Sequence, residues 1–146
     1  MTERNNDSTA HFLRGRHAIV TGGGRGLGRT IATHLAGAGA NLTVMGRDHV
    51  DLEECASELR DRFGVEARGV GCDVSDPDSV SVAFSSATDA LGAAHVLVTN
   101  AGKARSESVT VTSLDLWEHT IAVNPTGPFM CTQQVLPSMT GNHARR

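Results

Sequence analysis

A run of small residues, Thr21-Gly-Gly-Gly-Arg-Gly-Leu-Gly28, has the spacing G-x-x-x-G-x-G. Glycines allow a tight turn and let backbone N–H groups come close to a ligand. If a helix begins within this run, its unpaired N–H groups and the positive end of its dipole favour an anion such as a diphosphate. The alternative is a helix-start turn whose small residues serve only packing. A P-loop is disfavoured because the G-K-S/T ending is missing.

Strand-like and helix-like patterns alternate around this run, so it is expected at a strand-to-helix turn. Short apolar runs predict strands over 17–21, 41–45, about 67–74 and 95–99. Apolar residues at helical spacing predict helices over 26–37, about 52–63, 77–91, a segment with Leu116, Trp117 and Val123, and about 127–139. Ser75-Asp76-Pro77 and Ser113 are typical of helix starts. This alternation of strands and helices predicts an α/β fold with a Rossmann-like doubly wound parallel sheet that stops after four strands.

The composition limits the class of protein. The 146 residues are 39% apolar and 20% charged, which fits one domain with a buried core. A net charge of −3 gives no electrostatic footprint for nucleic acid, and no apolar run approaches the length of a membrane span. Three separated cysteines without a C-x-x-C favour a reducing cytoplasm, and no metal-site spacing is present. We expect a disordered leader over 1–12 and a dinucleotide-binding domain over 13–146.

Four motifs stand in order along the chain: the glycine run, Asp73 closing the third predicted strand, Asn100-Ala-Gly102 after the fourth, and Asn124 in Val-Asn-Pro-Thr-Gly. In this combination the chain resembles the short-chain dehydrogenases/reductases, in particular their 3-oxoacyl-carrier-protein reductase-like branch, over residues 13 to about 139. The resemblance implies an oxidoreductase that binds NAD(P) on a Rossmann fold. Thr99 departs from the commoner N-N-A-G motif, and Pro125 follows Asn124 where an aliphatic residue is usual.

The resemblance also implies roles for individual residues. Asp73 would hydrogen-bond the adenine amino group; the alternative is that Asp73 simply caps a loop. Asn124 resembles the residue that holds a water in the family's proton relay, although a helical Asn before Pro125 alone indicates a kink or a helix end. The other residues implied to bind or admit the cofactor are Gly22, Gly24, Gly26, Leu27, Gly28, Val74, Asn100, Ala101 and Gly102.

The end of the second predicted strand favours NADP(H) over NAD(H). An acidic residue at this position accepts hydrogen bonds from the ribose hydroxyls and repels a 2′-phosphate. Here the strand ends at Gly46, and Arg47 can pair with a 2′-phosphate. The family places Arg25 to help from the glycine loop. Asp48 is the rival acidic candidate but is better placed to cap the next helix. The alternative is that Arg25 and Arg47 are simply exposed to solvent and bind no phosphate.

The chemistry of the family needs a tyrosine, a lysine four residues later and an upstream serine. The sequence contains no tyrosine, and its one lysine, Lys103, lies in the wrong segment. We therefore expect residues 1–146 alone to be inactive and to bind cofactor poorly.

Two functions compete. One is a carbonyl reductase or alcohol dehydrogenase of which this is the N-terminal portion, and the other is a non-catalytic nucleotide-binding or assembly module. A small carbonyl or alcohol substrate is expected for the first. The full-length parent is expected to form a homo-oligomer through the apolar helix 127–136.

Overall fold

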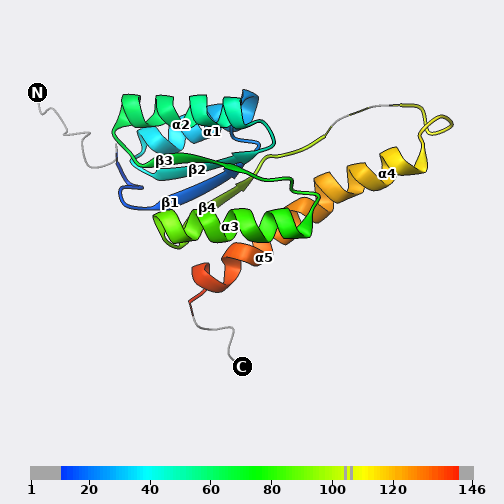
Figure 1. Cartoon of the computed structure of the whole chain (residues 1–146). Helices are drawn as coiled ribbons and strands as arrows, with labels where there is room; N and C mark the ends of the chain where they lie inside the picture. The colour runs from blue at the N-terminus through cyan, green and yellow to red at the C-terminus, as the bar shows by residue number, and fades with distance from the viewer. Residues whose placement is uncertain (1–10, 104, 106, 142–146) are drawn as a thin grey trace, which may run out of the picture.

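The computed structural model describes residues 11–103, 105 and 107–141. Within these residues strands and helices alternate, which confirms the α/β class (Figure 1). Their bounds are β1 His17–Thr21, α1 Gly26–Gly37, β2 Asn41–Gly46, α2 His49–Phe63, β3 Ala67–Gly71, α3 Pro77–Leu91, β4 Ala94–Thr99, α4 Leu114–Ile121, the π-helical turn η2 Ala122–Thr126 and α5 Gly127–Met139. Most of the expected leader lies outside the described residues, and its last two residues, His11 and Phe12, lie in a turn.

The four strands of the described chain form one parallel sheet in the order β3-β2-β1-β4. The chain leaves β1 toward β2 and β3, and then returns to place β4 on the other side of β1. This reversal makes the sheet doubly wound, as predicted, and in such sheets ligands bind beyond the carboxyl ends of the strands at the reversal. None of the helices in the described ranges is long and apolar enough to cross a membrane.

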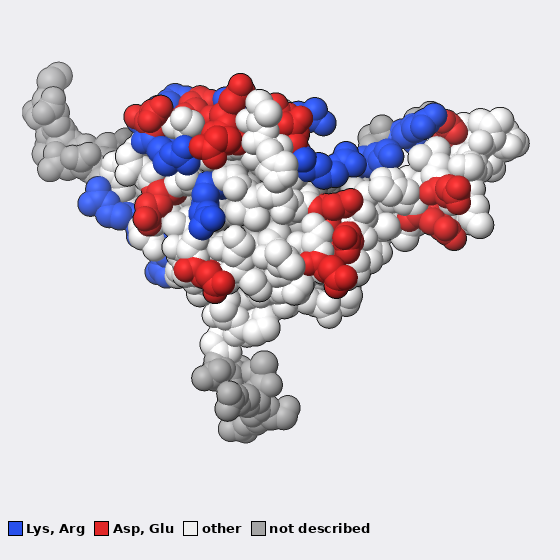
Figure 2. All heavy atoms as spheres, viewed as in Figure 1, with Lys and Arg blue, Asp and Glu red and all other residues white. Residues whose placement is uncertain are grey.

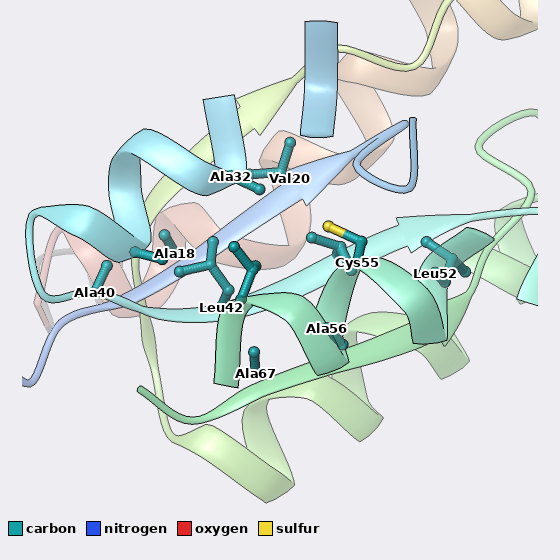
Figure 3. Packing of buried hydrophobic residues seen from close by; sticks show 12 residues of the cluster. Ala18, Val20, Ala32, Ala40, Leu42, Leu52, Cys55, Ala56 and Ala67 are labelled. Atoms are coloured by element: carbon teal, nitrogen blue, oxygen red, sulfur yellow. The ribbon is translucent and has the colours of Figure 1, made fainter. Parts of the chain in front are cut away.

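Helices cover both faces of the sheet, so the central strands β1 and β2 are buried from two sides, whereas β3 and β4 are mostly half-buried. Figure 1 shows α1 and α2 over one face and α3 with α5 over the other, while α4 projects beyond the sheet. Strand β1 alternates between the two cores: Ala18 and Val20 pack with α1 and α2, and Ile19 packs with α3 and α5. The core under α1 and α2 is built largely from alanines and aliphatic side chains, which lets these helices lie close to the strands (Figure 3).

The capping residues predicted for three helices are in place. The carboxylate of Asp48 accepts hydrogen bonds from the backbone N–H groups of Val50 and Asp51, at 2.9 and 3.2 Å, and so begins α2. Asp76 caps α3 in the same way. The Ser113 hydroxyl accepts a hydrogen bond from Leu116 at the start of α4. This confirms that Asp48 serves as a helix cap.

Two predicted bounds differ from the structure. Strand β3 ends at Gly71 and not at Val74, because the backbone N–H of Asp73 donates to the Ser79 hydroxyl, at 2.9 Å, instead of a neighbouring strand. Helix α4 ends at Ile121, so Val123 lies in η2. Pro125 has no N–H to donate, and the N–H of Gly127 reaches back five residues to the Ala122 carbonyl. The π turn is the local consequence of that proline.

Candidate functional site

A cleft of about 740 Å³ lies at the carboxyl ends of all four strands. Each strand contributes the segment that follows it, so the wall consists of four loops and the nearby side of α4 and η2. Most residues predicted to bind a cofactor line this cleft: Gly22, Gly24, Arg25, Arg47, Asp73, Val74, Asn100, Ala101 and Gly102. The parallel sheet thus brings together positions that span eighty residues of sequence.

Three predicted residues, Gly26, Leu27 and Gly28, are not part of the cleft wall and instead form the start of α1. Gly26 has a φ of +56°, a left-handed conformation that glycine adopts without strain. A Cβ on Gly28 would overlap the Gly22 carbonyl oxygen and come within 2.6 Å of the Asn100 side-chain nitrogen. These glycines therefore shape the turn. Leu27, which lies between them, is 69% exposed.

The start of α1 differs from the starts of α2, α3 and α4. Arg25 occupies the N-cap, and its side chain makes no capping hydrogen bond. The first-turn N–H groups of α1 therefore lack the side-chain acceptor that the other three helices have. Together with the positive end of the helix dipole, these N–H groups have the character that favours an anion beside the glycine loop.

Hydrogen bonds fix the glycine loop to the loop that follows β4. The buried hydroxyl of Thr21 accepts hydrogen bonds from the backbone N–H groups of Asn100 and Ala101, both at 3.1 Å. The Asn100 amide donates to the Gly22 carbonyl at 3.2 Å. Sequence reasoning assigned Thr21 no role of its own. The hydroxyl at the carboxyl end of a buried strand was the available signal, since such a group needs a partner.

Asp73 caps its own loop and also lines the cleft, so the cap is confirmed and the contact with an adenine amino group stays a prediction. Its Oδ1 atom accepts from the N–H and the hydroxyl of Ser75, at 3.0 and 2.6 Å. These bonds hold the pKa of Asp73 below its usual range, with smaller contributions from the charges of Arg47 and His119. No described group donates to Oδ2, which leaves one carboxylate oxygen available to a ligand.

Charged groups of both signs gather where β2 ends. Arg25 lies 4.0 Å from Asp51, and its side chain is 82% exposed. No carboxylate of the described residues lies within ion-pair distance of Arg47. Lys103 and His119 also line the cleft, and sequence reasoning assigned neither of them to it. On the face drawn in Figure 2, acidic and basic side chains are interspersed over α2.

Asn124, the one catalytic residue that the sequence implied, lies in η2 and is not part of the cleft wall. Its Oδ1 atom accepts a hydrogen bond from the Lys103 N–H, and its Nδ2 atom donates one to the Lys103 carbonyl, each at 2.8 Å. The neighbouring Val123 does line the cleft. Asn124 therefore holds the loop after Gly102 against the π turn. In the described ranges no three His, Cys, Asp or Glu side chains come together as a metal site.

The cleft fits a dinucleotide at its glycine end. A Cβ on Gly22 would lie 2.8 Å from the Asn100 amide nitrogen, and one on Gly24 would lie 3.2 Å from the backbone of Asp51 and Leu52. The missing side chains thus let the loop pack tightly against its neighbours while the uncapped end of α1 stays accessible. A diphosphate could accept hydrogen bonds from the N–H groups there, and Arg47 and Asp73 line the adjoining cleft.

Comparison with known proteins agrees with this geometry. The family model described as short chain dehydrogenase matches residues 16–145. The chain is 35% identical to a 3-oxoacyl-acyl-carrier-protein reductase FabG of Aquifex aeolicus, with 87% of this chain and 51% of the relative covered. It is 36% identical to an L-rhamnose 1-dehydrogenase (NADP(+)) of Thermoplasma acidophilum, with 89% and 51% covered.

Solved structures show the same fold. The L-sorbose reductase of Gluconobacter frateurii, complexed with NADPH and L-sorbose, superposes with a TM-score of 0.85 at 28% identity, covering 89% of this chain and 49% of the reductase. A blue fluorescent protein from a metagenomic library, in complex with NADPH, gives 0.79 at 34% identity, covering 87% and 52%. The chain spans about half the length of these relatives. By its motifs, its sheet and its family match, the chain belongs to the short chain dehydrogenase family of oxidoreductases.

Proposed function

We propose that residues 13–146 supply the NADP(H)-binding portion of an oxidoreductase that transfers a hydride between nicotinamide and a carbonyl or alcohol substrate. The observation that carries the proposal is the cleft itself. Its wall includes Arg25 at the N-cap of α1, Asp73 with its available Oδ2, and Arg47, and the uncapped start of α1 lies directly beside Arg25. Each of these groups matches a different part of an adenine dinucleotide phosphate.

The residues of the chain would divide the binding work. The N–H groups at the start of α1 hold the diphosphate, and Oδ2 of Asp73 accepts from the adenine amino group. Val74 flanks the adenine ring, while Ala101 and Gly102 leave room for the ligand backbone. The nicotinamide, when bound, supplies or receives the hydride.

The state of Asp48 supports NADP(H) over NAD(H). Its carboxylate already accepts hydrogen bonds from two backbone N–H groups at the start of α2, so it is poorly placed to accept hydrogen bonds from ribose hydroxyls as well. Arg47, directly before it, can offer its guanidinium to a 2′-phosphate. Two of the similar solved structures hold NADPH, and one of the similar enzymes is named for NADP(+).

We propose further that the 146 residues alone carry out no hydride transfer. The sequence contains no tyrosine to serve as the acid/base, and positioned proton transfer contributes roughly 10²–10⁴-fold to a rate. The test compares residues 1–146 with the in-frame extended gene, measuring NADPH oxidation with a panel of ketones. Ketone-dependent turnover by the short chain at about a thousandth of the rate of the extended one would contradict the proposal.

A non-catalytic nucleotide-binding or assembly module is the second candidate, and the same absence of tyrosine favours it. Sequencing the gene beyond the codon for Arg146 distinguishes the two candidates. A Y-x-x-x-K motif downstream in frame supports the reductase, and a stop codon supports the module.

We also propose that the full-length protein forms homo-oligomers through α5 and its neighbour α4. Trp117 on α4 and Phe129 on α5 are 59% and 60% exposed, while Cys131 and Val135 face the core. Exposed apolar surface of this kind is typical of protein contact surfaces. Light scattering at micromolar concentration tests this, and a monomer would contradict it.

We place the protein in the cytoplasm, since Cys55, Cys72 and Cys131 are free and buried.

A further inference from the structure

The ladder between β1 and β4 is irregular at its amino end, opposite the cleft. His17 pairs with Ala94, and the next residue, Ala18, pairs with Val96, so His95 lies opposite no residue of β1. The backbone N–H of His17 instead donates to Nδ1 of the His95 ring, at 3.1 Å. An imidazole nitrogen thus takes the place of the backbone carbonyl that a regular ladder would provide.

The side chain of His17 is buried beside this irregularity, with 1% of the residue exposed. Its Nδ1 lies 2.8 Å from the Gly92 carbonyl oxygen, and its Nε2 lies 2.8 Å from the hydroxyl of the fully buried Thr43. A carbonyl only accepts, so the Nδ1 atom of His17 carries a proton and donates it. Through these bonds one ring joins β1, β2 and the turn that leads into β4.

The bond to His95 requires a lone pair on its Nδ1 atom. A proton on that nitrogen and the hydrogen bond from the His17 N–H exclude each other. The His95 residue is exposed, so solvent protons reach its ring directly. Protonation would leave the N–H of a buried residue without its acceptor, and such a loss shifts a folding equilibrium by about tenfold.

Protonation of His17 is also unfavourable in the folded chain. Burial lowers the pKa of His17, the hydrogen bond to Gly92 partly offsets this, and a charge on His95 lowers it further. A histidine whose pKa is lowered on folding contributes stability that is present above about pH 6.5 and is lost as the pH falls through the folded pKa. The charge on His95 and the cost of charging His17 therefore act in the same direction.

Few other charges face this corner of the sheet. Strand β2 and helix α5, which packs on β4, contain no Asp, Glu, Lys, Arg or His. Arg16 directly precedes β1, and Asp89 lies near the end of α3, before the uncharged segment 90–94. On β3, Arg68 pairs in register with Thr43. No described ion pair involves any of these three residues. Histidine is the side chain whose unperturbed pKa allows a change of charge between about pH 5 and 8, whereas arginine and aspartate keep their charge there.

We propose that His95, His17, Thr43 and the Gly92 carbonyl form a pH-sensitive junction that holds the amino end of β4 on the sheet when His95 is neutral and releases it when His95 is protonated. The junction lies at the end of the sheet away from the cleft and does not depend on the proposed cofactor. It acts on β4, the strand that leads to Asn100 and Gly102.

The test measures urea unfolding of the wild-type chain and two variants at about pH 8 and about pH 5.5. The variant His95→Asn keeps an acceptor near the position of Nδ1 but cannot take up a proton. The matched control is His34→Asn, which removes an exposed histidine on α1. Between the two pH values the folding equilibrium constant of the wild type should fall about tenfold more than that of His95→Asn. The control should follow the wild type.

A second measurement needs no variant. Nitrogen-detected NMR of the wild type at about pH 8 should show His95 as the Nε2–H tautomer and His17 as the Nδ1–H tautomer. On acidification, the amide exchange protection of His17, corrected for intrinsic rates, should fall before that of Ile19. Equal pH dependence of the wild type and a folded His95→Asn, or an Nδ1–H tautomer at His95, would overturn the proposal.

Discussion

The side chain of Asn124 and the backbone of Lys103 hold each other through two reciprocal hydrogen bonds. The Lys103 N–H donates to Oδ1 of Asn124, and Nδ2 of Asn124 donates to the Lys103 carbonyl, each at 2.8 Å. The pair joins the loop after β4 to η2, a π turn made by Pro125. Because Gly102 and Val123 beside them both line the cleft, this contact ties together two segments of the cleft wall.

The first prediction concerns this contact. Asn124→Ala removes both bonds and should lower the free energy of unfolding by about 1–2 kcal/mol, measured by urea denaturation. Asn124→Asp keeps the acceptor but removes the donor, and places its charge beside a carbonyl. Its free energy of unfolding should therefore also lie below that of the wild type. Wild-type stability of the alanine variant would show that the contact is not formed in solution.

The second prediction concerns close packing in the glycine loop. Gly28→Ala would drive its Cβ into the Gly22 carbonyl and the Asn100 amide, so it should destabilise the fold by about 1–3 kcal/mol and weaken nucleotide binding. The matched control is Gly37→Ala at the end of the same helix, where the nearest atom would lie 3.5 Å away in the Phe63 ring. That variant should be as stable as the wild type or more so. Equal thermal midpoints for the two variants would contradict the packing argument.

The third prediction concerns the carboxylate opposite Arg25. Asp51 lies 4.0 Å from the Arg25 guanidinium at the end of the cleft where a 2′-phosphate would bind. A 2′-phosphate bound to Arg25 would lie at a similar distance from Asp51, and two unit charges about 4 Å apart in water interact by about 1 kcal/mol, so Asp51 would oppose the phosphate by about that amount. Asp51→Asn should raise the ratio of NADPH to NADH affinity by about fivefold. An unchanged or lower ratio, from calorimetric titration with both cofactors, would show that Asp51 mainly orients Arg25.

The fourth prediction concerns pH. The Ser75 hydroxyl and N–H lower the pKa of Asp73. A carboxylate whose pKa is lowered on folding contributes stability that is present above its unfolded value of about 3.9, and this stability is lost as the pH falls through the lower folded value. Ser75→Ala should therefore raise the pKa of Asp73 and move acid unfolding to higher pH. Carbon-detected NMR titration of Asp73 checks the first effect, and no change in that titration would contradict the assigned cause.

Local patterns were sufficient for most of the fold. The helix over 26–37 and the cap at Asp48 follow from residue types within one or two turns, and both are present in the structure. The parallel sheet then follows from the alternation, because strands joined by single helices pair in this way. Once the strands are parallel, residues after each strand must meet at one edge, which is why Asp73 and Asn100 share a cleft with the glycine loop.

The features that the sequence did not predict depend on contacts between distant residues. No periodicity reveals that His119 on α4 reaches the cleft, or that the Thr21 hydroxyl accepts two N–H groups from the loop after β4. The early end of β3 depends on Ser79, which lies in the following helix. The irregular ladder at His95 depends on a side chain replacing a backbone acceptor, and nothing in the strand pattern marks it.

The central claim, that this cleft binds NADP(H), is tested most directly by titrating residues 1–146 with NADPH and with NADH under identical conditions by calorimetry, beside an Arg47→Ala variant. The account predicts weak binding of both cofactors by the short chain, with NADPH tighter by about tenfold, and loss of that preference in the variant, because one charge-assisted phosphate contact contributes about 1.4 kcal/mol or more. Equal affinities, or tighter binding of NADH, would contradict it.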